Sequence, residues 1–428
     1  MQLEPAATPT QKSILDYLGI YPPLALGYLG LLFFMIGDGI EAGYLSKYLV
    51  DRNIATKDNV YLIFTVYGIT VAIAAWLSGA LSDLWGPRQV MAIGLAIWVV
   101  FEIALLLLGI APGNYSLIML LYGLRGFGYP LFAYGFLIWI TVAAPAHRLG
   151  TAVGWFWFAL TGGLFTSSSL IASVSIPMIG EYQTLWFSLA LVIIGGLIAL
   201  LGLQEPTGKR RLAPPGENPL LTLFSSFVVA AEQPKTIIGA IVRVINTAPQ
   251  NGFLVFLPLY FTQTIGFTTE QWLRVLFFMF LSNIIWNLLF GILGDRLGWR
   301  QTVAWCGGLG CTITTLLLYY VPHTLAPHNS VSLVYPLTIF AAILYGATLA
   351  GYVPLSALMP SLAPHNKAAA MSLLNLGAGA SNWVGPAIVG LLPWVGVGGV
   401  MWIYALMYLL SAGLALLLKL PSETSVHA

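Results

Sequence analysis

The sequence contains very little charge: only 7% of its 428 residues are Asp, Glu, Lys or Arg, whereas 58% are hydrophobic. A water-soluble globular chain carries about 25% charged residues. This shortage excludes an ordinary soluble protein and predicts a chain that crosses a lipid bilayer many times. The formal net charge is only +2, so the places where charges lie say more than their sum, and no nucleic-acid partner is expected.

Cysteine and histidine are also scarce. Cys306 and Cys311 are the only cysteines and lie in one apolar segment, so the sequence predicts neither a disulfide framework nor a metal site. The five histidines fall in loops or in the tail, at His147, His323, His328, His365 and His427. An enzyme inside the membrane would need a nucleophile–base pair or a metal constellation, so we expect no enzymatic activity and no cofactor. The first residues also lack the basic-then-apolar pattern of a cleavable signal peptide.

Long apolar segments are what the chain does contain. A membrane-spanning helix needs about 20 apolar residues, and the sequence offers twelve such segments. They lie at 23–50, 59–81, 88–110, 115–143, 150–175, 184–203, 236–263, 270–293, 299–321, 331–359, 366–392 and 399–420. The longest polar interruption divides them six and six. The expected domains are a tail (1–22), an N-terminal bundle (23–203), a loop (204–235), a C-terminal bundle (236–420) and a tail (421–428).

The basic residues predict the orientation, because Lys and Arg concentrate in cytoplasmic loops. One set of loops holds most of them: Lys12, Arg88, Arg148, Lys209, Arg210, Arg211, Lys235, Arg296, Arg300, Lys367 and Lys419. The opposite set holds Lys47, Arg52, Lys57 and Arg274. We therefore expect both termini in the cytoplasm.

The two halves of the chain repeat each other. One loop pattern follows both the second and the eighth apolar segment: Gly79, Asp83, Gly86 and Arg88, then Gly291, Asp295, Gly298 and Arg300. A second repeat relates Tyr122 and Tyr129 of the fourth segment to Tyr345 and Tyr352 of the tenth. Two halves in the same orientation, related by an axis along the membrane normal, are typical of secondary transporters. Glycines in the loops also suit tight turns between helices.

The duplicated loop resembles the signature of the major facilitator superfamily. This resemblance implies an all-α membrane protein with twelve transmembrane helices in two pseudo-symmetric six-helix bundles. The first copy departs from the usual pattern, with Leu84 in place of a basic residue and Pro87 before Arg88, which weakens the charge network expected there.

Further stretches resemble the bacterial polyol permeases, carriers of ribitol and D-arabinitol. They lie at 37–41, 122–132, 154–157, 176–181, 243–247, 266–269 and 375–382. The resemblance implies uptake of a neutral pentitol by proton symport across the bacterial inner membrane.

Two acids lie in the middle of the first apolar segment. Asp38 and Glu41 are three residues apart, so they share one face of a helix. A charged side chain near the bilayer centre costs at least about 2.5 kcal/mol. Arg125 of the fourth segment lies at a similar depth and is expected to pair with Asp38 or Glu41. We expect this group to couple transport to protons; the alternative is a static ion pair that fixes helix packing.

The seventh segment predicts a substrate-binding face. Arg243, Asn246 and Gln250 follow the spacing i, i+3, i+7, which places them on one side of a helix. Gln250 occupies the position of Asp38 in the repeat, so an amide that cannot carry a proton replaces an acid. Arg243 either contacts substrate or extends toward the cytoplasmic end of its helix.

Other polar and aromatic residues complete the candidate substrate site: Tyr122, Tyr129, Trp155, Asn283, Asn287, Tyr345, Tyr352, Asn375 and Asn382. Amides and hydroxyls can bind the hydroxyls of a polyol, and Trp155 can stack on its carbon chain. Each amide can instead form a hydrogen bond between helices. Glu102 of the third segment has no evident partner, and we expect a structural role.

The sequence therefore favours a proton-coupled symporter of a linear polyol, present as a monomer in the bilayer. A carrier of another small hydroxylated metabolite or of an organic anion remains the alternative. An anion carrier would need excess positive charge, and here Asp38 and Glu41 are expected to balance Arg125 and Arg243. A receptor is less favoured, because neither end offers an output domain.

Overall fold

The structure is a computed structural model that describes residues 20–145, 148–203, 205–213, 216, 230–364 and 367–419. Every regular element within these residues is helical, and strands are absent from them. Ten helices are long and apolar enough to cross a membrane. Two more long helices, α13 (Pro234–Leu259) and α19 (Lys367–Val389), pack against each other. The predicted all-α fold with twelve transmembrane helices in two bundles is confirmed.

The N-terminal bundle contains the first six spans. Their elements are η1 (Pro22–Leu24), α2 (Ala25–Ile40), α3 (Leu45–Asp51), α4 (Val60–Trp85), α5 (Pro87–Ala104), η2 (Leu105–Ile110), α6 (Tyr115–Arg125), α7 (Gly128–Ala143), α8 (Leu149–Thr161), η4 (Gly162–Ser167), α9 (Ser168–Ile179) and α10 (Glu181–Gly202). A short 3-10 helix, η5 (Pro206–Lys209), follows in the loop after this bundle.

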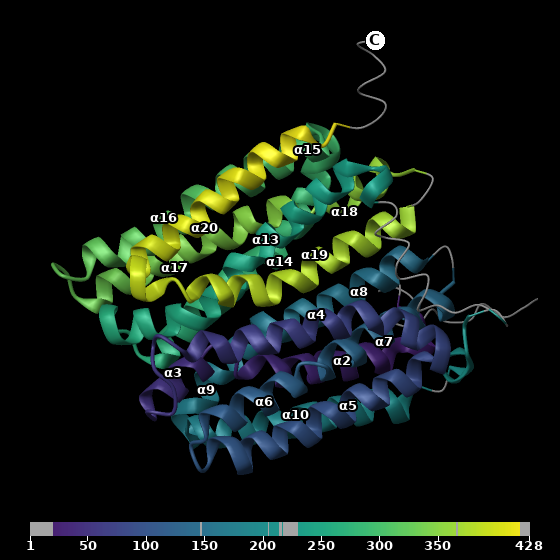
Figure 1. Cartoon of the computed structure of the whole chain (residues 1–428), viewed down its shortest axis with the longest axis horizontal. Coiled ribbons are helices and arrows are strands. Elements are labelled where there is room, and N and C mark those ends of the chain that lie inside the picture. The colour runs from purple at the N-terminus through teal and green to yellow at the C-terminus, as the bar shows by residue number, and fades with distance from the viewer. Residues whose placement is uncertain are drawn as a thin grey trace, which may run out of the picture.

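The C-terminal bundle contains the other six spans. Besides α13 and α19, its elements are η6 (Tyr260–Ile265), α14 (Thr269–Leu297), α15 (Trp299–Gln301), η7 (Thr302–Leu309), α16 (Gly310–Leu325), α17 (Val331–Leu349), η8 (Ala350–Tyr352), α18 (Leu355–Leu362) and α20 (Leu392–Leu417). The two bundles lie side by side in Figure 1, the first coloured from purple through blue to dark teal and the second from teal-green to yellow. Four of the interruptions, η2, η4, η6 and η7, are π-helical, a geometry often found at functional sites.

Close approach of small residues brings the bundles together along α4 and α19. A Cβ on Gly68 of α4 would lie 2.1 Å from the carbonyl oxygen of Asn382, so only glycine fits there. A Cβ on Gly379 of α19 would likewise lie 3.2 Å from the Cα of Ala72. Small residues permit such packing between membrane helices. These contacts place the long helix α19 against the opposite bundle.

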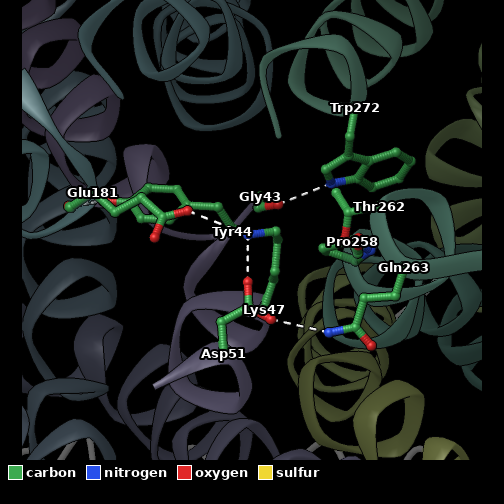
Figure 2. A network of polar contacts seen from close by, with 9 residues as sticks. All are labelled: Gly43, Tyr44, Lys47, Asp51, Glu181, Pro258, Thr262, Gln263 and Trp272. Atoms are coloured by element: carbon green, nitrogen blue, oxygen red, sulfur yellow. Dashed lines mark hydrogen bonds and ion pairs between the residues drawn. The ribbon is translucent and has the colours of Figure 1, made fainter. Parts of the chain in front are cut away.

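Polar contacts between the bundles gather at the end of the molecule where α3 lies in Figure 1, here called the α3 end, and Figure 2 shows these contacts from close by. The indole nitrogen of Trp272 donates to the carbonyl of Gly43 (2.8 Å), and the amide of Gln263 donates to Asp51 (2.9 Å). Lys47 bonds to Asp51 (2.5 Å) and to Glu181 (3.4 Å), which ties α3 to α10. Among the described residues, the hydrogen bonds that join the two bundles lie at this end, so the structure is closed there.

The repeated loops lie at the opposite end, and their hydrogen bonds stay within their own bundle or reach the loop that follows the first bundle. Gly86 and Gly298 adopt positive φ angles of 87° and 94°, which explains glycine at both turns. Arg88 donates to the carbonyl of Leu200 (2.6 Å) and Arg300 to that of Leu416 (3.2 Å). The other predicted loop residues are Gly79, Asp83, Gly291 and Asp295. The backbone carbonyl of Asp83 accepts bonds from the amides of Leu212 and Ala213, and Asp295 accepts from Trp299 (2.8 Å). Gly79 and Gly291 have open space beside them.

Candidate functional site

A buried group of charged side chains lies inside the N-terminal bundle. It comprises Asp38, Trp98, Glu102 and Arg125 together with Glu41, and is called the Arg125 cluster below. Arg125 forms an ion pair with Glu41 through Nη2 and donates to Glu102 through Nη1 (2.5 Å). Asp38 lies 4.0 Å from Arg125 Nη2 and accepts a bond from Trp98 Nε1 (2.5 Å). None of the four ionisable side chains is more than 3% exposed.

Helix ends and close helix contacts create this arrangement. α2 ends at Ile40 and α6 ends at Arg125, so Glu41 and Arg125 both lie where a helix is interrupted. A Cβ on Gly39 would lie 1.9 Å from the carbonyl oxygen of Leu164, which explains how α2 approaches η4 so closely. Glu102 lies near the end of α5, just before the π-helical η2. Three different spans therefore supply the charged side chains.

Aromatic rings surround the guanidinium. The Cζ atom of Arg125 lies 4.6 Å from the ring centre of Tyr122, 4.7 Å from that of Trp98 and 5.5 Å from that of Tyr67. Cations at such distances are attracted to the faces of aromatic rings, more strongly when water is excluded. These rings help to hold Arg125 in a dry site, and they place Tyr122, a predicted substrate ligand, against the guanidinium.

The cluster contains more acid than base. With all groups ionised, its three carboxylates and one guanidinium would carry a net charge of −2. Glu41 Oε2, Glu102 Oε1 and Arg125 Nε have no hydrogen-bond partner among the described residues. Buried charges without partners are costly, and a proton on a carboxyl group removes such a charge. The cluster is therefore chemically suited to take up and release protons.

Glu102 is the member that the sequence did not place. It was expected to be structural and without a partner, but it bonds directly to Arg125 and is fully buried. The signal that could have found it is depth, because Glu102 lies about as far from the end of its span as Glu41 does from the end of its own. The helix positions of Asp38, Glu41 and Arg125 did predict that these three lie together.

A second polar group lies on α13. Asn246 and Gln250 are both buried, and the side-chain oxygen of Asn246 has no partner among the described residues. Arg243, on the same face, is half-buried. The described residues give it no hydrogen bond and no carboxylate partner; its electrostatic neighbour is Tyr134 of α7, in the other bundle. The acids of the cluster surround Arg125, so by count they still balance both arginines, but none of them lies beside Arg243.

Most of the other predicted substrate ligands make bonds within the protein. The Asn283 amide donates to the Gly346 carbonyl (3.2 Å), and Asn287 donates to Asn283 (3.3 Å). Asn382 donates to the carbonyls of Ala378 and Gly379 in its own helix.

The predicted tyrosines of the C-terminal bundle are engaged as well. The hydroxyls of Tyr345 and Tyr408 bond to each other (2.7 Å), and that of Tyr352 bonds to Ser411. Tyr129 is buried, Trp155 packs edge-on against Phe158, and Asn375 is exposed. The residues on α13 therefore have the most polar atoms left over for a substrate.

Comparison with known proteins identifies the family. The profile of the Major Facilitator Superfamily matches residues 19–333 and 241–428. The chain belongs to this superfamily. Its members are transporters rather than enzymes, so this chain is a multi-pass membrane transporter and not an enzyme.

Three curated relatives align over almost the whole chain. The α-ketoglutarate permease of Bacillus subtilis (strain 168) is 42% identical, with 96% of this chain and 93% of the relative covered. The D-arabinitol transporter of Klebsiella pneumoniae is 37% identical, covering 96% of each chain. The ribitol transporter of the same organism is 35% identical, covering 96% of this chain and 95% of the relative. The resemblance to polyol permeases is confirmed. The relatives of the chain also include a permease named for a carboxylate.

A solved structure gives the same fold. The crystal structure of a D-xylose–proton symporter superimposes with a TM-score of 0.69 at 18% identity, covering 91% of this chain and 95% of the other. At this identity the likeness supports the fold alone.

Proposed function

We propose that this protein takes up a small, linear, hydroxylated solute by proton symport, with a pentitol such as ribitol or D-arabinitol as the first candidate. The observation that carries the proton coupling is the Arg125 cluster, in which three carboxyl groups share one arginine. The names of two relatives support a pentitol as the substrate.

A proton gives the cluster two electrostatic states. When the carboxyl groups are ionised, they compete for the N–H donors of Arg125. When one of them is protonated, it becomes neutral and no longer forms an ion pair with the guanidinium. Removing one partner from a buried ion pair is worth about 3–5 kcal/mol, which is enough to bias helix positions. We assign the proton first to Asp38, because it lies farthest from Arg125. Glu41 then holds Arg125 in place.

The driving force is sufficient for accumulation. One proton that falls through 100 mV supplies about 2.3 kcal/mol. Because each ~1.4 kcal/mol changes a concentration ratio tenfold, the voltage alone supports roughly fifty-fold accumulation of a neutral solute.

Alternating access follows from the two ends of the molecule. We propose that the membrane is the bacterial inner membrane and that both termini are cytoplasmic, so the α3 end faces outward. Contacts such as Gln263–Asp51 and Trp272–Gly43 then close the outer side, and their rupture accompanies opening to the outside. We also propose that one monomer carries out the whole cycle.

Transport by reconstituted protein tests the proposal. Proteoliposomes with an acidic outside should accumulate labelled ribitol or D-arabinitol above the outside concentration, and a protonophore should abolish the accumulation. Competition by unlabelled pentitols, hexitols and sugars ranks the substrates. Equal concentrations on both sides, with or without a pH gradient, would refute proton symport of these solutes.

An organic anion is the second candidate class. Arg243 is the observation that favours it, since this cation lies on the predicted substrate face and has no acid partner among the described residues. The name of one relative, an α-ketoglutarate permease, is in line with this possibility.

A further inference from the structure

Two arginines lie inside the spans of α6 and α13, and their surroundings differ. Arg125 is 1% exposed and contacts three carboxylates. Arg243 is half-buried, and the described residues offer it no carboxylate. A cationic side chain at membrane depth is costly and generally serves the transported species or a partner. The described residues thus leave the guanidinium of Arg243 available to an anion from solution.

The known neighbours of Arg243 belong to both bundles. Its Cβ packs close to Gly377 of α19, where a Cβ on the glycine would lie 3.3 Å away. Tyr134 of α7 is the titratable group near its guanidinium. Arg243 and Tyr134 thus belong to opposite bundles and interact electrostatically across the boundary between them. A tyrosine hydroxyl can donate to an anion, and a guanidinium can bind a carboxylate through two parallel N–H bonds.

The amides on the same helix face define what lies beyond the anion. At 1.5 Å per residue, Asn246 and Gln250 lie about 4.5 and 10.5 Å along the axis from Arg243. The buried side-chain oxygen of Asn246 has no donor among the described residues, so a substrate hydroxyl can supply one. Gln250 offers both a donor and an acceptor. This order suits a short chain with a carboxylate at one end and hydroxyl or oxo groups along it.

From this geometry we infer that Arg243, assisted by Tyr134, binds the terminal carboxylate of a short hydroxy or oxo acid, which the protein accepts as a substrate. The inference rests on the proposed function as a transporter and extends its substrate class from pentitols to pentonates and 2-oxo dicarboxylates. It adds a specificity-determining role to Arg243, because lysine offers a point charge and cannot form the same two-pronged contact.

Competition binding to the purified full-length protein tests the inference. Ribonate and 2-oxoglutarate should displace labelled ribitol from the wild-type protein. In the Arg243→Gln variant, the ratio of carboxylate affinity to ribitol affinity should fall at least about tenfold. The same ratio for Arg243→Lys should lie between those of the wild type and Arg243→Gln, because lysine keeps the charge but cannot form two parallel N–H bonds. Arg274→Gln changes an exposed arginine of α14 and provides the matched control, with an unchanged ratio.

The outcomes separate this inference from the proposed function. If ribitol binds but neither carboxylate competes, or if both compete equally well in Arg243→Gln, the role of Arg243 is wrong and the polyol proposal stands. If ribitol does not bind, thermal stabilisation by each carboxylate is measured directly. If a carboxylate stabilises the wild type but not Arg243→Gln, the inference is supported and the polyol proposal fails. If neither carboxylate stabilises the wild type, both are overturned.

Discussion

Where the N-terminal bundle carries the Arg125–Glu102 ion pair, the C-terminal bundle carries a hydrogen bond between two threonines. The repeat aligns Tyr122 with Tyr345, so Arg125 corresponds to Thr348; alignment of the two loop patterns makes Glu102 correspond to Thr314. The Thr314 and Thr348 hydroxyls lie 2.8 Å apart. The third and fourth spans of the N-terminal bundle therefore meet through an ion pair. The equivalent spans of the C-terminal bundle meet through neutral hydroxyls.

This difference bears on why the charges are present. The C-terminal bundle packs its helices without any buried ion pair among its described residues, using bonds such as Tyr345–Tyr408 and Tyr408–Asn246. The fold alone thus does not require Arg125 and three acids at these positions. A static packing role is a weaker explanation for the charged cluster than the uptake and release of protons, which neutral hydroxyls cannot perform at ordinary pH.

The largest expected effect comes from removing the central charge. Arg125→Gln leaves three carboxyl groups without their cation, and loss of one partner of a buried pair costs about 3–5 kcal/mol. We expect poor expression, a lower unfolding temperature and no transport. The double variant Arg125→Gln/Glu41→Gln should regain part of the lost stability, since it removes one of the stranded acids. Equal unfolding temperatures in the single and double variants would show that Arg125 and Glu41 are not energetically paired.

A smaller effect is expected from the neutral bundle. Tyr408→Phe deletes the hydroxyl that bonds to Tyr345 and to the backbone of Asn246. The loss should be about 1 kcal/mol in stability, because the net contribution of a neutral hydrogen bond is of this size. Uptake driven by a pH gradient should persist. Loss of coupling with intact exchange in this variant would contradict the assignment of proton handling to the N-terminal bundle alone.

The smallest effect is expected at the contact between the bundles. Gln263→Leu removes the bond to Asp51 at the α3 end, where the side chains are partly exposed. An exposed polar contact contributes about 0.2–1 kcal/mol, so opening at this end should become only a few times more frequent. Labelling of a cysteine introduced beside Gly43 should therefore accelerate modestly. An unchanged labelling rate would mean that this bond does not hold the end closed.

The sequence predicted the charged site through depth and periodicity. Asp38 and Glu41 had to share a helix face, and Arg125 lay at a matching depth, so their proximity followed from helix geometry. Glu102 escaped because sequence periodicity does not reveal which face of α5 turns toward α6. The same limitation affected Arg243. Whether an acid lies beside its guanidinium depends on helix rotations that only the structure supplies.

The asparagines show a second limit of prediction from the sequence. Asn283 and Asn382 were candidates for substrate contacts, yet their side chains bond to backbone carbonyls within the bundle. An asparagine inside a span must find hydrogen bonds somewhere, and the residue type alone does not say whether a helix or a substrate provides them. The overall fold was more predictable, because apolar length and the repeated loops between spans are encoded locally.

Uphill uptake compared with exchange in proteoliposomes tests the central claim most directly. Asp38→Asn, Glu41→Gln and Glu102→Gln are compared with Thr314→Val, the change at the position equivalent to Glu102. Exchange of labelled for unlabelled substrate needs binding and alternation but no net movement of protons. The account predicts that Asp38→Asn loses accumulation driven by a pH gradient but keeps exchange, that Glu102→Gln weakens accumulation, and that Thr314→Val keeps both. Full accumulation by all three acid variants, or its loss in Thr314→Val with exchange intact, would contradict the claim that the Arg125 cluster carries the proton.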